Sequence, residues 1–393
     1  MARWVRAIRH GWVVKGDVPG PDVDEFAGAT EVVAALAGHQ GGGDTLLAVQ
    51  HPHRTPEALA DGLSLAAALP AARHTLDRLR ASAYRPVHQV VAPYRVDGRD
   101  GVAVGVLGLV DSAAVDVHGA SRVRHSEQVY REVVVERAAV LAGLGCATSA
   151  AMLVPVGHGE QLTAAVLRSI AALGAPAVSM IDSGGRTHRL WLLGPGAEQD
   201  AALTAVELGP LLVADGNHRV AAASTGDHSN LLAFVTGGPA LGIGAIHRAL
   251  VGTGLTAEDL AGAWRRKGLT VREVMHLTPP VLPGTVVVRA AGAGLLVELP
   301  ALEPGEPVPR IDHGLVERLL IGDALGIDPE RPHLHALPAG HPAGPHVDAL
   351  LQLAPVPFAD VLAVHEQGRR MPRKSTYFTP KPRSGLLLAD LTA

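Results

Sequence analysis

The chain reads LLVADGNHRVAAA from Leu211 to Ala223. Three apolar residues suited to a buried strand lead into Asp-Gly-Asn, a tight turn, and an alanine-rich stretch suited to a helix follows at once. When a strand is followed by a glycine turn and then by the first turn of a helix, consecutive backbone N–H groups can point at an anion. Gly216 allows close approach to the backbone, and Arg219 adds a planar charged fork suited to phosphate oxygens. The stretch therefore predicts binding of a nucleotide phosphate.

The same residues also fit a turn with no ligand. Asp-Gly-Asn is an ordinary turn sequence, Asp215 is suited to capping the helix, and His218-Arg219 can lie in solvent. Short glycine motifs have many false positives, so the loop by itself leaves both interpretations open.

The composition restricts the class of protein. The chain has 393 residues, enough for two or three compact regions, and with 47% apolar and 18% charged residues it is predicted to be globular. Aromatic residues make up only 3%, which argues against a base-stacking surface for single-stranded nucleic acid. The net charge of −4 argues against a general nucleic-acid surface. We therefore do not expect a nucleic-acid partner.

Several common site types are missing from the sequence. Cys146 is the only cysteine, so no disulfide within the chain and no cysteine-rich zinc site is possible. No HExxH motif occurs, and His51-Pro52-His53 has no third ligand nearby, so we predict no metal site built by the protein alone. Neither a P-loop, a kinase catalytic loop nor a GxSxG elbow is present. With no signal peptide and no long apolar run, we expect a soluble cytoplasmic protein without a membrane partner.

Hydrophobic periodicity predicts a mixed α/β protein, with the densest alternation of strands and helices between residues 96 and 250. We predict three regions: 1–95, 96–250 and 251–393. In the first, a Gly41-Gly42-Gly43 loop precedes an expected strand from Thr45 to Val49, and a helix is expected from Ala71 to Arg80 with Pro70 in its first turn. In the last, 347–353 and 358–367 are expected to be helical.

Two further groups are candidate site residues. Glu127 precedes a predicted helix, and it fits either a general base or a first-turn acid favoured by the helix dipole. His-Arg pairs recur at the ends of predicted strands, where α/β sites collect functional groups, although a chain with 20 histidines produces such pairs by chance. The pairs are His188-Arg189, His218-Arg219 and His247-Arg248.

Several motifs resemble those of a large bacterial and archaeal family marked by an ADGHHR signature. Residues 5–9 resemble its opening FRALR, 188–191 its HRLW and 245–248 its P.HR segment. Residues 105–110, Glu127, 136–137 and 143–155 resemble its strand, HE and EDR…GAN.SP segments. Residues 371–381, MPRKSTYFTPK, closely resemble its MPQKSTYFYPK terminus. This family is placed in the ParB/sulfiredoxin-like superfamily, beside the archaeal-type free L-serine kinases.

The resemblance implies a ParB/sulfiredoxin-like α/β core, elaborated at both ends, whose G-x-H-R box holds nucleotide phosphates. By position, Gly216, Asn217, His218 and Arg219 form that box, preceded by Asp215. Glu127 falls where the serine kinases are thought to place the base that deprotonates the serine hydroxyl. Asn217 and Ser126 replace two family histidines, and Asn217 cannot supply charge or accept a proton near neutrality. The opening PYDVI motif is degraded to Gly20-Pro21-Asp22-Val23.

Lys374-Ser375-Thr376 combines a flexible cation with two hydroxyls, a set suited to phosphate or to a substrate carboxylate. A purely structural tail explains the adjoining aromatic residues but not this cluster. We predict that the segment folds back on the 96–250 core and places Lys374 beside the phosphate loop.

The leading hypothesis is a kinase that uses ATP or ADP with Mg²⁺ to phosphorylate a small hydroxyl metabolite, with L-serine favoured. Glu127, Asp215 and His218 are the expected catalytic residues. The expected nucleotide-binding residues are Gly216, Asn217, His218, Arg219, His247, Arg248, Lys374, Ser375 and Thr376. One alternative is a ParB-like nucleotide-binding switch with little or no turnover. Another is a DNA-associated protein, which the acidic net charge disfavours. A homo-oligomer is compatible with each.

Overall fold

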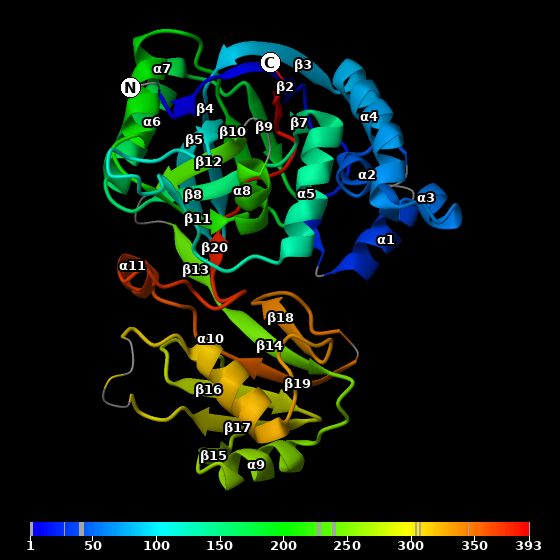
Figure 1. Ribbon diagram of the computed structural model, residues 1–393, viewed down its shortest axis with the longest axis vertical. Coiled ribbons are helices and arrows are strands. Elements are labelled where there is room, and N and C mark those ends of the chain that lie inside the picture. The colour runs from blue at the N-terminus through cyan, green and yellow to red at the C-terminus, as the bar shows by residue number, and fades with distance from the viewer. Residues whose placement is uncertain are drawn as a thin grey trace. The chain divides into compact units, whose positions relative to one another are not determined.

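The computed structural model describes residues 3–26, 28–38, 43–225, 229–237, 241–302, 305, 308–344 and 346–392. The chain divides into two compact units. Unit 1 comprises Met1–His125, Val129–Gly242 and Thr379–Ala393, and unit 2 comprises Ser126–Gln128 and Ile243–Phe378. Both units combine sheets with helices, which confirms the predicted mixed α/β class (Figure 1). The predicted region 1–95 and residues 96–242 of the predicted region 96–250 share one unit, apart from Ser126–Gln128, because their strands pair with each other and with the C-terminal residues.

A nine-stranded sheet forms the centre of unit 1. Strand β1 (Val5–Arg6) pairs with β5, and the other strands lie in the order β6-β11-β8-β12-β5-β4-β10-β9. Their bounds are β4 (Ala92–Gly98), β5 (Gly101–Asp111), β6 (Val123–Arg124), β8 (Ala151–Pro155), β9 (Val178–Ile181), β10 (Thr187–Leu190), β11 (Leu211–Asp215) and β12 (Asn230–Gly237). Branched aliphatic residues of these strands build the core together with helices α6 (Gly159–Leu173), α7 (Ala197–Val206) and α8 (Asn217–Ser224).

A four-stranded sheet completes unit 1, in the order β3 (Tyr84–Val90), β2 (Ile8–Val14), β21 (Leu387–Asp390) and β7 (Cys146–Ala147). The central strand β21 therefore comes from the far end of the sequence. The remaining helices are η1 (Val23–Glu25), α1 (Ala29–Ala37), α2 (Leu46–Gln50), η2 (Pro52–Arg54), α3 (Pro56–Ala60), α4 (Leu65–Ser82) and α5 (Arg131–Leu144).

Two predictions for the N-terminal region are wrong. The expected strand from Thr45 to Val49 is helix α2, because the Thr45 hydroxyl caps it by accepting a hydrogen bond from the Ala48 N–H at 3.3 Å. The short apolar run is buried on all sides, so it shows no helical period. Helix α4 begins at Leu65, which places Pro70 in its interior instead of its first turn. Gly41 and Gly42 of the predicted glycine loop lie outside the described residues.

Unit 2 contains an antiparallel six-stranded sheet in the order β15-β17-β16-β19-β14-β18. The bounds are β14 (Ile246–Val251), β15 (Thr270–Glu273), β16 (Thr285–Ala290), β17 (Ala293–Glu298), β18 (Leu334–Pro338) and β19 (Val347–Gln352). Its helices are α9 (Ala257–Arg266), α10 (Asp312–Leu315), the π-helical segment η3 (Val316–Asp323) and α11 (Phe358–Glu366). Trp264 is fully buried in the core, and its Nε1–H donates to the Leu320 carbonyl at 2.9 Å.

The predicted helix over 347–353 is strand β19, and this prediction is wrong. The strand pairs with both β14 and β16, so ladder hydrogen bonds on both edges outweigh the local apolar spacing. The helix expected over 358–367 is confirmed as α11. The chain passes between the units on both sides of Ser126–Gln128, within β13 (Gly242–Gly244) and within β20 (Tyr377–Thr379). Within the part of the chain that the structure describes, no helix is long and apolar enough to cross a membrane.

Candidate phosphate-binding loop

The turn between β11 and α8 is the predicted strand, glycine turn and helix start. Gly216 has φ +92° and ψ 31°, a left-handed conformation that L side chains rarely adopt. A Cβ at this position would lie 2.7 Å from Arg219 Nε and 3.1 Å from Ala151 Cβ. Glycine is therefore required at this position, because an L side chain would strain the backbone and would collide with its neighbours.

Charged side chains gather around this loop. Arg219 forms an ion pair with Asp215, one turn earlier, and also bonds to the Ser149 hydroxyl. Lys381 Nζ lies 2.8 Å from Asp215 Oδ1 and 3.6 Å from Asp24 Oδ1. Two cations thus share the Asp215 carboxylate at the start of α8, where the helix dipole already favours an anion.

Asn217 and His218 are held by residues just before helix α5. His125 Nδ1–H donates to Asn217 Oδ1 at 3.2 Å. His218 Nε2 accepts the Tyr130 N–H at 3.0 Å, and the two rings are stacked with their centroids 5.9 Å apart. Because Nε2 is an acceptor, the proton of the neutral ring is on Nδ1. His218 therefore holds the residue that precedes α5 through its Nε2 atom.

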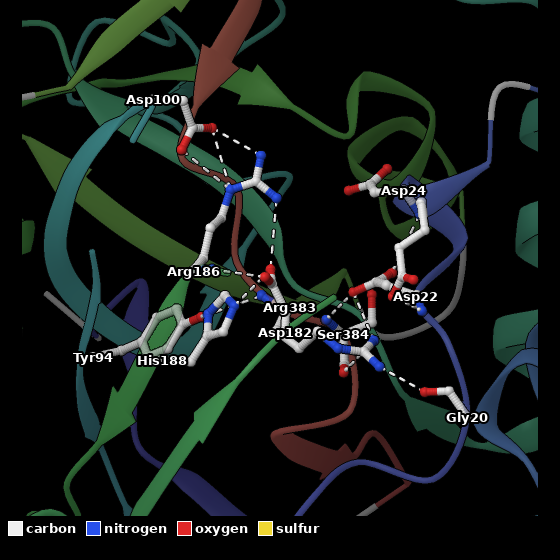
Figure 2. Close-up of polar contacts among 11 residues, drawn as sticks. Gly20, Asp22, Asp24, Tyr94, Asp100, Asp182, Arg186, His188, Arg383 and Ser384 are labelled. Carbon is white, nitrogen blue, oxygen red and sulfur yellow. Dashed lines mark hydrogen bonds and ion pairs between the residues drawn. The ribbon is translucent and has the colours of Figure 1, made fainter. Parts of the chain in front are cut away.

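A buried ion pair ties the C-terminal residues to the same region (Figure 2). Arg383 Nη1 lies 2.8 Å from Asp22 Oδ2, and both side chains are less than a tenth exposed. The Ser384 N–H also donates to Asp22 Oδ2 at 2.8 Å, and the Ser384 hydroxyl lies 3.2 Å from that of Ser149. The contacts connect Asp22 with Arg219 through two serines, so the loop is backed by a continuous polar network.

This network extends to His188, which lies between Asp182 and Tyr94 (Figure 2). Burial opposes ionisation of Asp182, yet hydrogen bonds from His188 and the Arg186 N–H hold its pKa below the usual value. Burial lowers the pKa of His188 even though Asp182 opposes this. A neutral His188 donates Nε2–H to Asp182 at 3.0 Å and accepts the Tyr94 hydroxyl on Nδ1 at 2.6 Å. His188 is thus a buried structural residue.

The other predicted site residues belong to unit 2, where the C-terminal segment surrounds Glu127. Glu127 Oε2 accepts the Lys374 N–H at 3.0 Å. Glu127 Oε1 accepts the Ser375 and Thr376 N–H groups, each at 3.3 Å, and the Thr376 hydroxyl at 2.9 Å. The Lys-Ser-Thr cluster therefore engages the predicted base mainly through its backbone.

Arg248 supports this segment from inside unit 2. It is 1% exposed, its Nε lies 2.6 Å from Glu317 Oε1, and its other nitrogens donate to the Arg373 and Lys374 carbonyls at 3.1 Å. His247 Nδ1 accepts the Leu353 N–H at 3.2 Å, and burial lowers the pKa of this histidine. These contacts favour a supporting role over the predicted cofactor contact for both residues.

The predicted residues thus form two groups. Residues 215–219 lie together in unit 1, whereas Glu127, the 247–248 pair and residues 374–376 lie together in unit 2. Placement of Lys374 beside the phosphate loop stays a prediction, and Lys381 is the residue of the same motif that contacts Asp215. Sequence reasoning missed Lys381, Asp22 and Asp24, although Lys381 ends the C-terminal motif and both aspartates lie in or beside the degraded opening motif. No group of three metal-ligating side chains occurs among the described residues.

The family model described as "Protein of unknown function (DUF1015)" matches residues 55–268, more than half of the chain. The chain therefore belongs to this family. No curated protein matches it.

Several solved structures are similar to the chain. One is a free serine kinase in complex with AMP, with 10% identity, 71% of this chain and 92% of that chain covered, and a TM-score of 0.39. Another is SbnI with a C-terminal truncation from Staphylococcus aureus, with 12% identity, coverage of 73% and 88%, and a TM-score of 0.40. A conserved hypothetical protein from Pyrococcus furiosus has 9% identity, coverage of 71% and 95%, and a TM-score of 0.38. At these values the likenesses define neither a function nor a site.

Proposed function

We propose that the chain is a nucleotide-dependent phosphotransferase that acts on a small hydroxyl metabolite, and that the loop from Asp215 to Arg219 binds the nucleotide phosphates. The observation that carries the proposal is the left-handed Gly216 between a buried strand and the start of α8, with Arg219 and Lys381 beside it. The sequence resemblance favours L-serine as the acceptor and a ParB/sulfiredoxin-like ancestry for the core.

The donor set at this loop fits ATP or ADP. The loop leads into the first turn of α8, and the first turn of a helix is a place where backbone N–H groups and the helix dipole suit the non-bridging oxygens of a phosphate. Arg219 and Lys381 balance the charges of Asp215 and Asp24, and the dipole of α8 adds a positive potential at the loop. A bound phosphate competes with Asp215 for both cations, because its oxygens accept the same hydrogen bonds.

The loop also fits the Mg²⁺ that accompanies a nucleotide. This ion is usually held by one or two carboxylates together with the phosphates, and does not need a site built by the protein alone. Asp24 and Asp215 approach the same ammonium group of Lys381, and both offer hard oxygen ligands. Asp24 and Asp215 would hold the ion together with the phosphates, and its charge would offset the repulsion between Asp215 and a phosphate.

The part played by Glu127 is proposed separately, since the loop assignment does not depend on it. A general base must accept the proton of the acceptor hydroxyl within hydrogen-bonding distance. Glu127 Oε1 already accepts three hydrogen bonds and Oε2 only one, so Oε2 is the atom suited to a substrate hydroxyl. The segment around Lys374 fixes the direction of this carboxylate.

A nucleotide-binding switch without efficient transfer is the second candidate. It is favoured by the four protein donors that already engage Glu127, and by the occupied Nε2 of His218. Asn217, which replaces a family histidine, also favours the switch, because its amide cannot take up a proton near neutrality.

One experiment separates the two candidates. The purified protein is incubated with Mg²⁺, ATP or ADP, and a panel of amino acids, and phosphorus NMR monitors the formation of a phosphomonoester. Reactions without Mg²⁺ and with Arg219→Ala are the controls. A new phosphomonoester that needs both supports the phosphotransferase. Nucleotide binding without any product supports the switch, and absence of nucleotide binding rejects both.

A further inference from the structure

The C-terminal segment from residue 379 to residue 384 is held at both of its ends within unit 1. At one end the Thr379 hydroxyl donates to the Asp100 carbonyl at 2.9 Å. Near the other end the Arg383 N–H donates to the Tyr94 hydroxyl at 3.1 Å. Tyr94 lies on β4, and Asp100 lies in the turn between β4 and β5. The segment is therefore anchored on one strand of the nine-stranded sheet and on the turn that follows this strand.

The Tyr94 hydroxyl has a fixed direction (Figure 2). It donates to His188 Nδ1 at 2.6 Å, and His188 Nε2–H donates to Asp182 at 3.0 Å. Burial raises the pKa of Tyr94, so the hydroxyl keeps the proton that it donates. Because this proton is directed to His188, a lone pair of the oxygen is left to accept the Arg383 N–H. The buried chain of hydrogen bonds thus fixes one point of the segment.

The side chain of Arg383 gives a second anchor (Figure 2). Arg383 Nη1 lies 2.8 Å from Asp22 Oδ2, and Nη2 donates to the Gly20 carbonyl at 2.7 Å. The Ser384 N–H donates to the same Asp22 oxygen at 2.8 Å. Asp22, Arg383 and Ser384 are all buried, so water competes little for these contacts. Asp22 therefore holds two successive residues of the segment.

Lys381 lies between these anchors. It follows Pro380 and precedes Pro382, and a proline disfavours the helical conformation of the residue before it. Lys381 Nζ lies 2.8 Å from Asp215 Oδ1 and 3.6 Å from Asp24 Oδ1, and its side chain is 16% exposed. The anchors on both sides and the restricted backbone together place the ammonium group beside the loop that begins at Asp215.

We propose that Tyr94, Asp22 and Arg383 are positioning residues for Lys381, and that they hold its ammonium group where the loop binds a nucleotide. The ligand in this proposal rests on the proposed function, whereas the placement of Lys381 can be measured by itself. Lysine has a long flexible side chain, so an ammonium group that is already in place binds phosphate with a smaller loss of conformational entropy. Loss of an anchor should therefore weaken nucleotide binding only when Lys381 is present.

Chemical labelling of lysines measures the placement of Lys381 without a nucleotide. Acetylation by an N-hydroxysuccinimide ester, followed by peptide mass spectrometry, compares Lys381 with the exposed Lys267 in the same sample. Tyr94→Phe keeps the ring and removes the hydroxyl. Thr236→Val is the matched control, because it removes a buried hydroxyl that donates to the Val104 carbonyl at 2.9 Å in the same sheet.

We expect labelling of Lys381 to rise in Tyr94→Phe and to stay at the wild-type level in Thr236→Val. Unchanged labelling of Lys381 in Tyr94→Phe overturns the proposal. An equal rise in both variants also overturns it, because any lost buried hydrogen bond would then loosen the segment.

A double-mutant cycle with ADP tests whether the anchor acts through Lys381. By calorimetry, we expect Lys381→Met to weaken ADP binding roughly tenfold and Tyr94→Phe to weaken it roughly fivefold or more, because a charge-assisted contact to phosphate is lost or misplaced. Tyr94→Phe in the Lys381→Met background should add less than about a twofold loss. Fully additive losses, or an unchanged affinity of Tyr94→Phe, overturn the proposal.

Asp22→Asn takes the place of Tyr94→Phe in both experiments if that variant does not fold. It removes the charge that pairs with Arg383 and keeps an acceptor for the Ser384 N–H, and the same changes are expected. Increased labelling of Lys381 in a protein whose wild type binds no ADP rejects the nucleotide loop and supports the anchoring of Lys381. Binding of ADP together with unchanged labelling rejects the anchoring and leaves the nucleotide loop in place.

Discussion

Gly216 is the residue on which the loop geometry depends, because a Cβ there meets Arg219 Nε at 2.7 Å. We expect Gly216→Ala to lower the free energy of unfolding by roughly 1–3 kcal/mol, through backbone strain and overpacking. Gly157→Ala is the control, since a Cβ at Gly157 has open space around it and its φ is not positive. Urea unfolding of both variants measures the difference. Equal stability of the two would mean that the loop relaxes without cost.

Arg219 is expected to contribute directly to nucleotide affinity. Arg219→Ala should weaken binding by roughly 1 kcal/mol or more, because a charge-assisted contact to phosphate is lost. Arg168→Ala, at an exposed arginine on α6, controls for the change in net charge. Calorimetry with ADP compares the two. Unchanged affinity in a folded Arg219→Ala variant would reject the phosphate-loop assignment.

A variant at Glu127 distinguishes a role in phosphate transfer from a role in nucleotide binding. Glu127→Gln keeps the shape but removes the base, so turnover should fall by roughly 100-fold or more while nucleotide affinity changes little. Thr376→Val is the control, because it removes one hydrogen bond to Glu127 and leaves the carboxylate. Steady-state kinetics of both variants test this. Near wild-type turnover of Glu127→Gln would make Glu127 only an anchor for the C-terminal segment.

At the scale of elements, the sequence predicts a helix or a strand correctly where apolar spacing, turn residues and composition all favour the same element. The strand and helix around Gly216 are present because the apolar run, the turn and the alanine-rich stretch agree with each other. Residues 45–49 and 347–353 were assigned wrongly, since a short apolar run fits a buried strand and a buried helix equally well. Burial and strand pairing decide such cases, and neither is visible in one sequence.

Helix α4 contains a proline at a costly position. Pro70 is the sixth residue of α4, so it removes an intrahelical hydrogen bond, and its side chain is exposed. We expect Pro70→Ala to raise the free energy of unfolding by about 1–3 kcal/mol. Pro56→Ala is the control, because Pro56 is the first residue of α3, where a missing N–H costs nothing. Chemical denaturation measures both, and a destabilised Pro70→Ala would show that unit 1 needs the proline.

At the scale of the molecule, the sequence predicted the loop but not its surroundings. Gly216 and Arg219 are close in sequence, and a local pattern reveals them. Lys381, which contacts the Asp215 carboxylate, comes 166 residues after Asp215, and Asp24, which contacts Lys381, comes 191 residues before Asp215. Such contacts depend on how the sheets assemble, so a single sequence cannot predict them.

Buried histidines make the stability of both units depend on pH. Burial is the first cause that lowers the pKa of His51 in unit 1 and of His313 in unit 2 to about 3. In the unfolded chain the histidine pKa is about 6.5, so between these values the unfolded state binds more protons. Stability should therefore be complete above about pH 6.5 and fall as the pH decreases, by at most about 1.4 kcal/mol per pH unit for each histidine.

Urea unfolding from about pH 7 to pH 5 checks this expectation. His313→Gln should flatten the dependence for unit 2, and His118→Gln, at an exposed histidine, should leave it unchanged. Stability that is constant over this range in wild type would contradict the neutral state of both buried rings.

Strand β21 lies between β2 and β7, so the first and the last residues of unit 1 complete one sheet. A ribosome makes β2 early and β21 only after residues 243–378 of unit 2, at roughly 5–20 residues per second. During that time β2 and β7 have edges that no other strand of this sheet covers, and unpaired edges invite association with other chains. Unit 2 can acquire its structure on the ribosome, whereas unit 1 can close only after its last strand has been synthesised.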